Sequence, residues 1–420
     1  MTDVAGPETR PPNPEDLRRR CEDVVLAWRD RLVAASHDLH AHPELAFEEH
    51  RSAAVVAALL RDADFDVTVG VWGLDTAIEA VYGDGDMTVT LCAEYDALPG
   101  IGHGCGHNII ATAGAGAAIA LSRVADELGI RVKLLGTPAE EKGAGKAHLL
   151  EAGAWEDATV SLMVHPGPGI VAPTAGISTQ SRDRFRVEFT GRAAHAAAAP
   201  TAGINAGDAA TIMQVAIGLL RQHLPDTVRV SAVTLSGGDV SNIIPATAVV
   251  EAEVRSFDMT ETADIKKRVL ACVDGAATAT GCGYSITPVD PVYEPLIQYP
   301  FLADRFDAAL EHRGRVITPI DRALGGGSTD MGNVSQVVPS IHPMIGVMGS
   351  TSAPHTADFA RDAVTPAADD AIVDGAYALA AAVVDLATDP DARAAVTELK
   401  RNRAPGATRK PAYGEAPAPG

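Results

Sequence analysis

Short apolar runs alternate with helical patterns along most of this chain, and this alternation limits the folds open to it. Runs typical of buried strands occupy residues 75–83, 87–95, 131–138, 158–164 and 340–348. Helical periodicity lies between them, at 22–40, 48–61, 108–128, 143–152, 299–312 and 367–387. Continuous apolar runs this short suit strands that are covered on both faces. The pattern therefore predicts an α/β domain with a mixed, mostly parallel sheet flanked by helices.

Between residues 182 and 290 the order of strand and helix patterns is different. Its strand patterns at 184–191, 228–238, 247–257 and 283–289 surround helical patterns at 205–222 and 262–279. The order strand–helix–strand–strand–helix–strand is the split βαβ pattern. We therefore expect an inserted ferredoxin-like α+β domain at 182–290, between two parts of the α/β domain at 16–181 and 291–388. Residues 1–15 and 389–420 are rich in proline and charge, and we predict that both are disordered.

Composition excludes several function classes. A net charge of −21, from 34 basic and 55 acidic residues, argues against a nucleic-acid partner. The N-terminal residues contain no apolar signal-like region, so a cytoplasmic location is expected, and no long uninterrupted apolar run predicts a membrane span. The five cysteines are irregularly spaced, which argues against a disulfide framework. Of these cysteines, Cys105 alone has polar, ligand-like neighbours.

Ionisable side chains cluster where the predicted strands end. They are Asp96, His103, Cys105 and His107 after the strand at 87–95, Glu140 and Glu141 after 131–138, His165 after 158–164, and His355 after 340–348. The carboxyl ends of parallel strands meet at one edge of a sheet, where α/β proteins bind their ligands. Thiolate, imidazole and carboxylate together suit zinc or a similar divalent transition metal. The glycines of "GIGHGCGHNI" allow close backbone approach and positive φ.

Roles within this cluster follow from side-chain chemistry. We expect Asp96 to orient a ligating imidazole, as carboxylates commonly do in metal sites. The adjacent Glu140 and Glu141 point opposite ways on an extended segment, so one can ligate while the other faces the substrate water. A carboxylate beside an activated water is the usual arrangement for a general base.

Six ordered motifs carry a family resemblance that covers about residues 30–385. They are "HDLHAHPELAFEEHRSAA", "EYDALPGIGHGCGHN", "GTPAEEKGAGKAHLLEAGAW", "GRAAHAAAAP", "SNIIPATAVVEAEVRS" and "GGGSTDMGNVS". Together they resemble the dinuclear metallopeptidases and amidohydrolases that include aminoacylase, glutamate carboxypeptidases and auxin-conjugate hydrolases. The nearest branch is typified by one of the subunits of aminobenzoyl-glutamate hydrolase and by the aminoacylase-1-like proteins.

The resemblance implies a set of site residues. The metal ligands would be Cys105, His107, Glu141, His165 and His355, with two divalent ions (zinc or manganese, cobalt as a third possibility) and Cys105 as a bridge. Glu140 would be the general base. His195, in the inserted lid domain, would reach the active site of the partner chain and stabilise the oxyanion. Asn242, assisted by Arg255, would contact the substrate carboxylate, and the loop with Ser328 and Asp330 would border the pocket.

One position departs from the aminoacylase and carboxypeptidase pattern. Those branches carry a metal-binding histidine two residues before the strand-end aspartate, whereas this chain has Glu94. We expect Glu94 not to ligate, with Cys105 or His107 as the replacement. His103 is an additional histidine without an assigned role, and we expect it to support the site or line the pocket.

The resemblance implies a metal-dependent amidohydrolase that cleaves N-acyl amino acids or small dipeptide-like substrates, as a homodimer assembled through the lid. Two other functions are compatible with parts of the pattern. One is a cysteine hydrolase with Cys105 as nucleophile and His107 or His103 as base, which leaves Glu141, His165 and His355 unused. The other is a non-catalytic protein whose lid clamps a peptide or an amino-acid conjugate.

Overall fold

A six-stranded mixed sheet forms the centre of the larger of two structural units. The structure is a computed structural model that describes residues 13–319 and 327–413. The strand order is β1 (Asp66–Val71), β2 (Leu74–Tyr82), β4 (Ile130–Gly136), β3 (Met87–Ala93), β5 (Val160–Leu162) and β13 (Ser340–Ile341). β3 pairs in parallel with β4 and β5, and β13 in parallel with β5, whereas β1 and β2 form an antiparallel edge. The expected mixed, mostly parallel sheet is confirmed.

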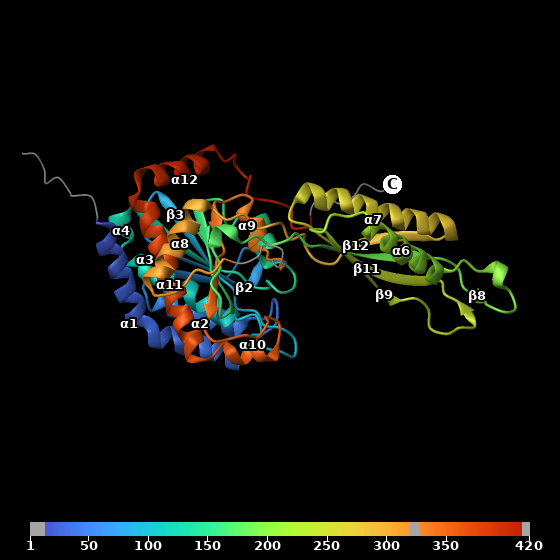
Figure 1. Cartoon of the computed structure of the whole chain (residues 1–420), viewed down its shortest axis with the longest axis horizontal. Helices are drawn as coiled ribbons and strands as arrows, with labels where there is room; N and C mark the ends of the chain where they lie inside the picture. Colours follow the sequence, from blue (N-terminus) through green and yellow to red (C-terminus); the bar gives the residue numbers. More distant parts are fainter. Residues whose placement is uncertain (1–12, 320–326, 414–420) are drawn as a thin grey trace, which may run out of the picture.

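Helices cover this sheet on both sides (Figure 1). The main ones are α1 (Pro14–Ala41), α2 (His50–Arg61), α3 (His107–Ser122), α8 (Pro300–His312) and α11 (Pro366–Thr388). α3 is buried along its whole length. A Cβ on its Gly116 would lie 2.9 Å from Leu32 of α1 and 3.0 Å from Ala376 of α11. The small residues of α3 thus allow close helix packing.

α11 is long and apolar enough to cross a membrane by length and composition alone. In the structure 89% of its most apolar window is buried, and its neighbours are α1, α3 and α8. Its composition is accounted for by its place in the protein core. The shorter elements of this unit are α4 (Ala125–Leu128), α5 (Gly145–Ala152), α9 (Met331–Ser335), α10 (Ala357–Asp362), β6 (His165–Pro168) and β14 (Met344–Val347).

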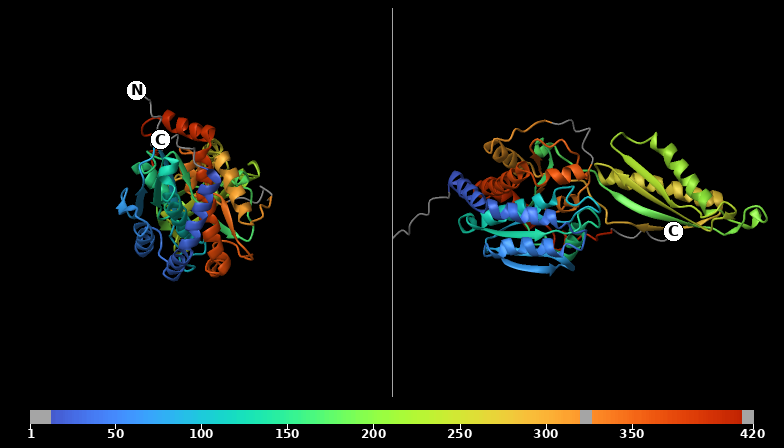
Figure 2. Two further views of the ribbon diagram at one scale, coloured as in Figure 1. Left: turned by 90° about the vertical axis from the view of Figure 1, so that its left-hand side faces the viewer. Right: turned by 90° about the horizontal axis from the view of Figure 1, so that it is seen from below.

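The second unit is a four-stranded antiparallel sheet with two helices on one face. Its strand order is β12 (Gly283–Pro288), β7 (Asp183–Thr190), β11 (Thr247–Arg255) and β9 (Arg229–Ser236), and its helices are α6 (Ala206–Arg221) and α7 (Met259–Thr280). Alternate residues of β7 and β11 point into a core shared with both helices. The two units lie end to end along the long axis of the molecule (Figure 2). A small pair of strands, β8 (Ala194–His195) and β10 (Ile243–Ile244), lies at the end of this lid unit away from the larger unit (Figure 1).

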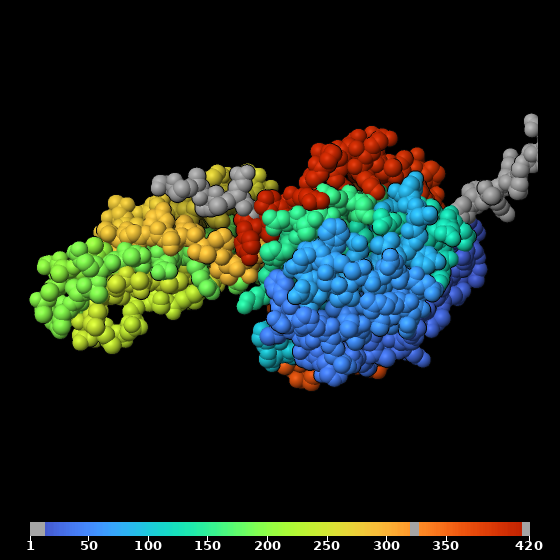
Figure 3. Space-filling model, turned by 180° about the vertical axis from the view of Figure 1, so that it is seen from behind, coloured from blue at the N-terminus to red at the C-terminus, as the bar shows by residue number. Residues whose placement is uncertain are grey.

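The C-terminal segment corrects one expectation. Residues 389–420 were predicted to be disordered, but Pro390–Asn402 form helix α12, which lies over the larger unit (Figure 3). Asp389 caps this helix by accepting hydrogen bonds from two backbone N–H groups, and Pro390 occupies its first turn. Val396 is fully buried, and Arg393 donates to the carbonyl of Gly129. Capping and packing therefore outweigh a composition typical of disorder. At the other end, residues 14 and 15 already belong to α1, and residues 1–12 lie outside the described part of the chain.

Candidate metal centre

Five side chains from four segments meet at a cleft between the two units: Cys105, His107, Glu141, His165 and His355. Cys105 Sγ lies 3.4 Å from His165 Nε2 and 3.4 Å from His355 Nε2. His355 Nε2 is in turn 3.4 Å from Glu141 Oε2. The ligand atoms of Cys105, His107 and His165 all lie within 4.8 Å of one another, as do those of Cys105, Glu141 and His355. Cys105, Glu141, His165 and His355 line a cavity of about 960 Å³ that extends to residues of the lid unit, and His107 is buried behind them.

Unusual backbone conformations bring these segments together. Gly106 has φ +77°, and a Cβ there would lie 2.6 Å from Pro166, so only glycine lets this loop approach β6 so closely. Of the six described non-glycine residues with positive φ, one adjoins the cluster and one belongs to it: Ala139 at 62° and His355 at 65°. Such conformations persist where the surrounding structure holds them, and they cluster at functional sites.

Asp96 orients two members of the cluster, which matches the role that its position suggests. Its Oδ1 lies 3.1 Å from His107 Nδ1, and its Oδ2 accepts the backbone N–H of Glu141 at 3.0 Å. Burial by itself raises the pKa of Asp96, but His107 outweighs it and holds the pKa below its usual value. With Nδ1 bonded to Asp96, Nε2 of His107 is the nitrogen left to face the cluster.

Three carboxylates surround that nitrogen. Glu94 Oε2, Glu141 Oε1 and Glu140 Oε2 lie 3.6, 3.8 and 3.9 Å from His107 Nε2. Among the described residues, His107 Nε2, Glu94 Oε2 and Glu141 Oε1 are buried without a hydrogen-bond partner. Buried polar atoms normally find partners because leaving them unpaired is costly. A divalent cation satisfies all three, and the thiol, imidazole and carboxylate donors suit zinc-like metals, so the residues fit a metal centre.

Lys146, at the start of α5, is a member of this region that sequence reasoning missed. Its side chain is fully buried, and its Nζ donates to Glu94 Oε1 and, at 2.7 Å, to Asp330 Oδ1. Burial alone raises the pKa of Glu94, but Lys146 and then His107 outweigh it and lower the pKa. The one available signal was a lysine between glycine and alanine, five residues after Glu141.

In the loop at 327–330, Ser328 borders the pocket as expected but Asp330 does not. Asp330 is fully buried and accepts both the backbone N–H and the Nζ of Lys146, so it does not line the cavity and cannot contact substrate there. Ser328 does line the cavity, and its Oγ accepts a hydrogen bond of 3.0 Å from Arg255 Nη1. Arg182 lines the same wall.

The two lid residues expected to act in the site lie elsewhere within this chain. His195 and Asn242 belong to the β8 and β10 region at the distal end of the lid (Figure 1). His195 is exposed, and its Nδ1 accepts the backbone N–H groups of Ala197 and Ala198 at 3.2 and 3.0 Å. Its proton therefore sits on Nε2, which is left as a donor.

Two further histidines are buried near the cluster. His103 stacks on His40 at a centroid distance of 6.2 Å and lines a separate cavity of about 520 Å³, and burial lowers its pKa to about 3. His342 is also buried, and its Nε2 has no hydrogen-bond partner among the described residues. Its ring lines the cavity of about 960 Å³, and its centroid lies 5.4 Å from that of His165. The sequence pattern placed His342 inside one predicted strand, 340–348, whereas the structure ends β13 at Ile341.

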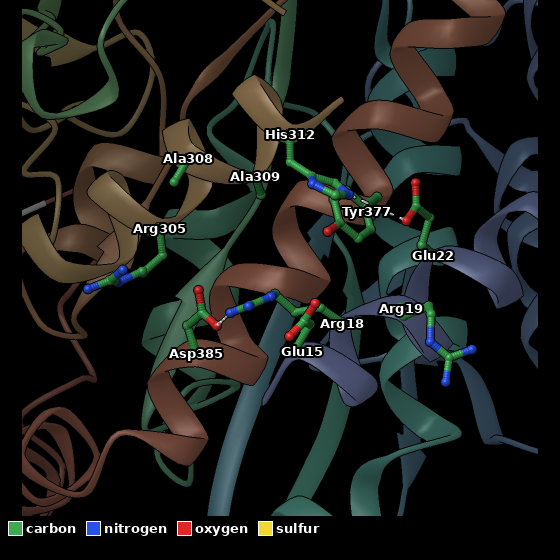
Figure 4. A pocket seen from close by; sticks show the side chains of 10 residues that line it. All are labelled: Glu15, Arg18, Arg19, Glu22, Arg305, Ala308, Ala309, His312, Tyr377 and Asp385. Atoms are coloured by element: carbon green, nitrogen blue, oxygen red, sulfur yellow. Dashed lines mark hydrogen bonds and ion pairs between the residues drawn. The ribbon is translucent and has the colours of Figure 1, made fainter. Parts of the chain in front are cut away.

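A further cavity, of about 490 Å³, lies between α1, α8 and α11 (Figure 4). Its lining holds three arginines and three carboxylates, so their formal charges balance. Arg18 is bonded to Asp385, and His312 Nε2 lies 3.7 Å from Glu22 Oε2. This cavity therefore offers no excess charge to a ligand.

Comparison with known proteins agrees with this geometry. Residues 80–385 match the model for peptidase family M20/M25/M40. The chain is 35% identical over 395 residues to a Xaa-Arg dipeptidase of Mus musculus, covering 90% of both chains. It is 34% identical over 286 residues to one of the subunits of p-aminobenzoyl-glutamate hydrolase of Escherichia coli, covering 63% of this chain and 59% of that protein.

Solved structures share the fold. The YXEP protein of Bacillus subtilis, described as a dinuclear metal binding peptidase, has a TM-score of 0.65 at 22% identity, covering 85% of this chain and 98% of that one. Aminobenzoyl-glutamate utilization protein from Klebsiella pneumoniae has a TM-score of 0.66 at 20% identity, covering 89% and 98%.

Fold, site and relatives together define a metal-dependent hydrolase of amide or peptide bonds. The chain belongs to peptidase family M20/M25/M40. This confirms the expected amidohydrolase over the alternatives of a cysteine hydrolase and a binding protein. Cys105 Sγ lies 3.4 Å from the Nε2 atoms of both His165 and His355.

Proposed function

We propose that this enzyme holds two divalent ions, zinc or manganese, and hydrolyses the amide bond of N-acyl amino acids or dipeptide-like substrates. The ligands are Cys105, His107, Glu141, His165 and His355. One observation carries this assignment. The potential ligands form two groups, one of Cys105, His107 and His165 and one of Cys105, Glu141 and His355, and these groups are connected through two side chains. Cys105 belongs to both groups, and the two oxygens of Glu141 face His107 and His355 at 3.8 and 3.4 Å.

Glu140 is the proposed general base. When bound, the ions supply polarisation of the scissile carbonyl and a lowered pKa for water. Burial and the charges of Glu94 and Glu141 raise the pKa of Glu140 well above its usual value, which suits a group that takes a proton and later delivers it to the leaving amine. Tyr293 donates a hydrogen bond of 2.8 Å to the Glu140 carbonyl and so fixes its backbone.

The cavity wall favours a substrate with a free carboxylate. Arg255 and Arg182 both line it. Each also pairs with a carboxylate of this chain, Glu253 and Asp290 respectively, but a guanidinium group carries further N–H donors that can bind a substrate carboxylate. Among the described lining residues the acidic side chains are Glu140 and Glu141, both in the reactive centre. No described lining residue is thus free to pair a substrate guanidinium. The preferred substrate is an N-acyl or aminobenzoyl-type amino acid with a neutral or acidic side chain, in contrast to the Xaa-Arg dipeptides named for the mouse relative.

A substrate panel tests this proposal. Purified enzyme loaded with Zn²⁺ or Mn²⁺ is assayed for amino-acid release from aminobenzoyl-glutamate, acetyl-amino acids, and dipeptides that end in arginine or glutamate. We expect release from the N-acyl substrates, at least tenfold slower turnover of the arginine dipeptides, and loss of activity with EDTA. Activity that survives EDTA contradicts the metal assignment, and a preference for arginine dipeptides contradicts the role given to the wall.

We also propose that the lid forms a homodimer in the cytoplasm. β9 is an edge strand, and its Val233 and Leu235 are exposed, as are Val215 and Leu219 of the neighbouring α6. An exposed apolar edge of this kind favours pairing with a second chain. If two lids pair through β9 and α6, the distal His195 of one chain can reach the reactive centre of the other chain. The five free cysteines are in keeping with a reducing compartment.

Light scattering after size exclusion tests the dimer. Leu219→Glu places a charge on the exposed apolar strip and should convert a dimer to a monomer with little turnover. Leu399→Glu, at a similarly exposed position on α12, should remain dimeric. A monomeric wild-type enzyme with full activity contradicts the proposal.

A further inference from the structure

Glu94, at the end of β3, has its two carboxylate oxygens in different environments. Oε1 accepts a hydrogen bond from Lys146 Nζ. Oε2 is buried without a hydrogen-bond partner among the described residues and lies 3.6 Å from His107 Nε2. The ligand atoms of Glu94, His107 and Glu140 form a third group within 4.8 Å of one another.

We propose that Glu94 is an additional ligand of the ion that His107 binds, and that Lys146 and Asp330 are positioning residues that hold its carboxylate in place. This inference rests on the proposed dinuclear site and replaces the expectation that Glu94 does not ligate.

The ion pair with Lys146 does not by itself account for Glu94. Asp330 already serves Lys146 as a counter-ion, since it accepts from Nζ at 2.7 Å and from the backbone N–H at 2.9 Å. All three side chains are fully buried, so two carboxylates share one ammonium group away from water. A buried charge without compensation is strongly unfavourable. A divalent cation beside Oε2 supplies the missing positive charge.

Neighbouring carboxylates point to the same conclusion. Glu94 Oε2 and Glu140 Oε2 both face His107 Nε2, so two like charges approach one another in a buried site. Glu140 lines the cavity and is open to substrate, whereas Glu94 is fully buried behind it. The difference in accessibility therefore assigns the two roles: Glu94 binds the ion, and Glu140 acts as the general base on the substrate water.

Metal binding tests the proposal directly. Wild type and Glu94→Gln are dialysed against Zn²⁺ or Mn²⁺, and bound metal is counted by mass spectrometry and titrated against a chelator. We expect two ions per chain in wild type, and in Glu94→Gln at least a tenfold weaker affinity for one of them. Asp374→Asn is the matched control, because Asp374 is a buried carboxylate that pairs with Arg313 and Arg315 away from the site. It should bind two ions with wild-type affinity.

A Glu94→Gln protein that binds both ions with wild-type affinity overturns the inference. If Glu94→Gln does not fold, Glu94→Asp provides the second measurement, because it keeps the charge but shortens the reach. The visible absorption of its Co²⁺ form should differ from that of wild type, and an identical spectrum contradicts ligation. A wild-type protein that binds fewer than two ions refutes the dinuclear site itself, which is a different result.

Discussion

Replacing Lys146 by methionine tests the electrostatics of the buried centre most directly. Methionine is similar in length and apolar, so the change removes the ammonium group without leaving a large void. Glu94 and Asp330 then lose the ammonium group that bonds both of them. Both carboxylates are fully buried, so water cannot take its place.

The expected loss follows from that burial. Breaking a buried ion pair by removing one partner costs about 3–5 kcal/mol. At about 2 °C per kcal/mol for a unit of this size, the melting temperature of metal-free protein should fall by roughly 6–10 °C. Metal loading should reduce the difference, because a cation beside Glu94 compensates its charge.

Lys133→Met is the matched control for this measurement. Lys133 is also buried, and its Nζ donates to the Ala154 carbonyl at 2.8 Å and to Asp157. The Asp157 side chain is 38% exposed, so its carboxylate can be hydrated when the lysine is removed. Thermal unfolding followed by circular dichroism in EDTA should show less than half the loss of Lys146→Met. An equal or larger loss in Lys133→Met refutes the reasoning.

Further predictions concern catalysis and metal uptake. Glu140→Gln should retain both ions and lose about 10²- to 10⁴-fold in kcat, and activity within tenfold of wild type would exclude Glu140 as the base. Burial raises the pKa of the Cys105 thiol, so metal binding must displace its proton. The apparent metal affinity should therefore fall about tenfold for each unit by which the pH decreases. A chelator titration that gives the same metal affinity at several pH values contradicts this. Mixing inactive His195→Ala and Glu140→Gln chains should restore about a quarter of wild-type turnover if each site combines both chains, whereas no recovery argues for action within one chain. Arg255→Met should raise KM about 10- to 100-fold with little change in kcat if its guanidinium binds the substrate carboxylate, and an unchanged KM excludes that contact.

Much of the architecture could be predicted because burial imposes local patterns. Continuous apolar runs marked β3, β4 and β5, and period-two alternation marked β7 and β11. The C-terminal segment was mispredicted because the prediction relied on its proline and charge content. Asp389 followed by Pro390 is a helix-start signal, and the prediction did not use it.

The reactive centre was predictable only in part. Cys105, His165 and His355 stand at strand ends, where topology makes convergence a reasonable expectation. Lys146 carries no such signal, because it follows a glycine-rich loop. His342 was missed because the predicted strand 340–348 ran through it, whereas β13 ends at Ile341. The placement of His195 at the far end of the lid depends on how the lid sheet is oriented, which no local pattern specifies.

The sequence by itself determined which chemistry the chain can offer: thiol, imidazole and carboxylate groups at the ends of buried strands, with a second domain inserted among them. Tertiary structure alone decided which atom faces which. Asp330 bonds Lys146 across 184 residues of sequence, and that contact directs Glu94 toward His107. The reason is physical: side-chain chemistry and burial periodicity are local properties, whereas the partner of a buried charge is set only when distant segments pack together.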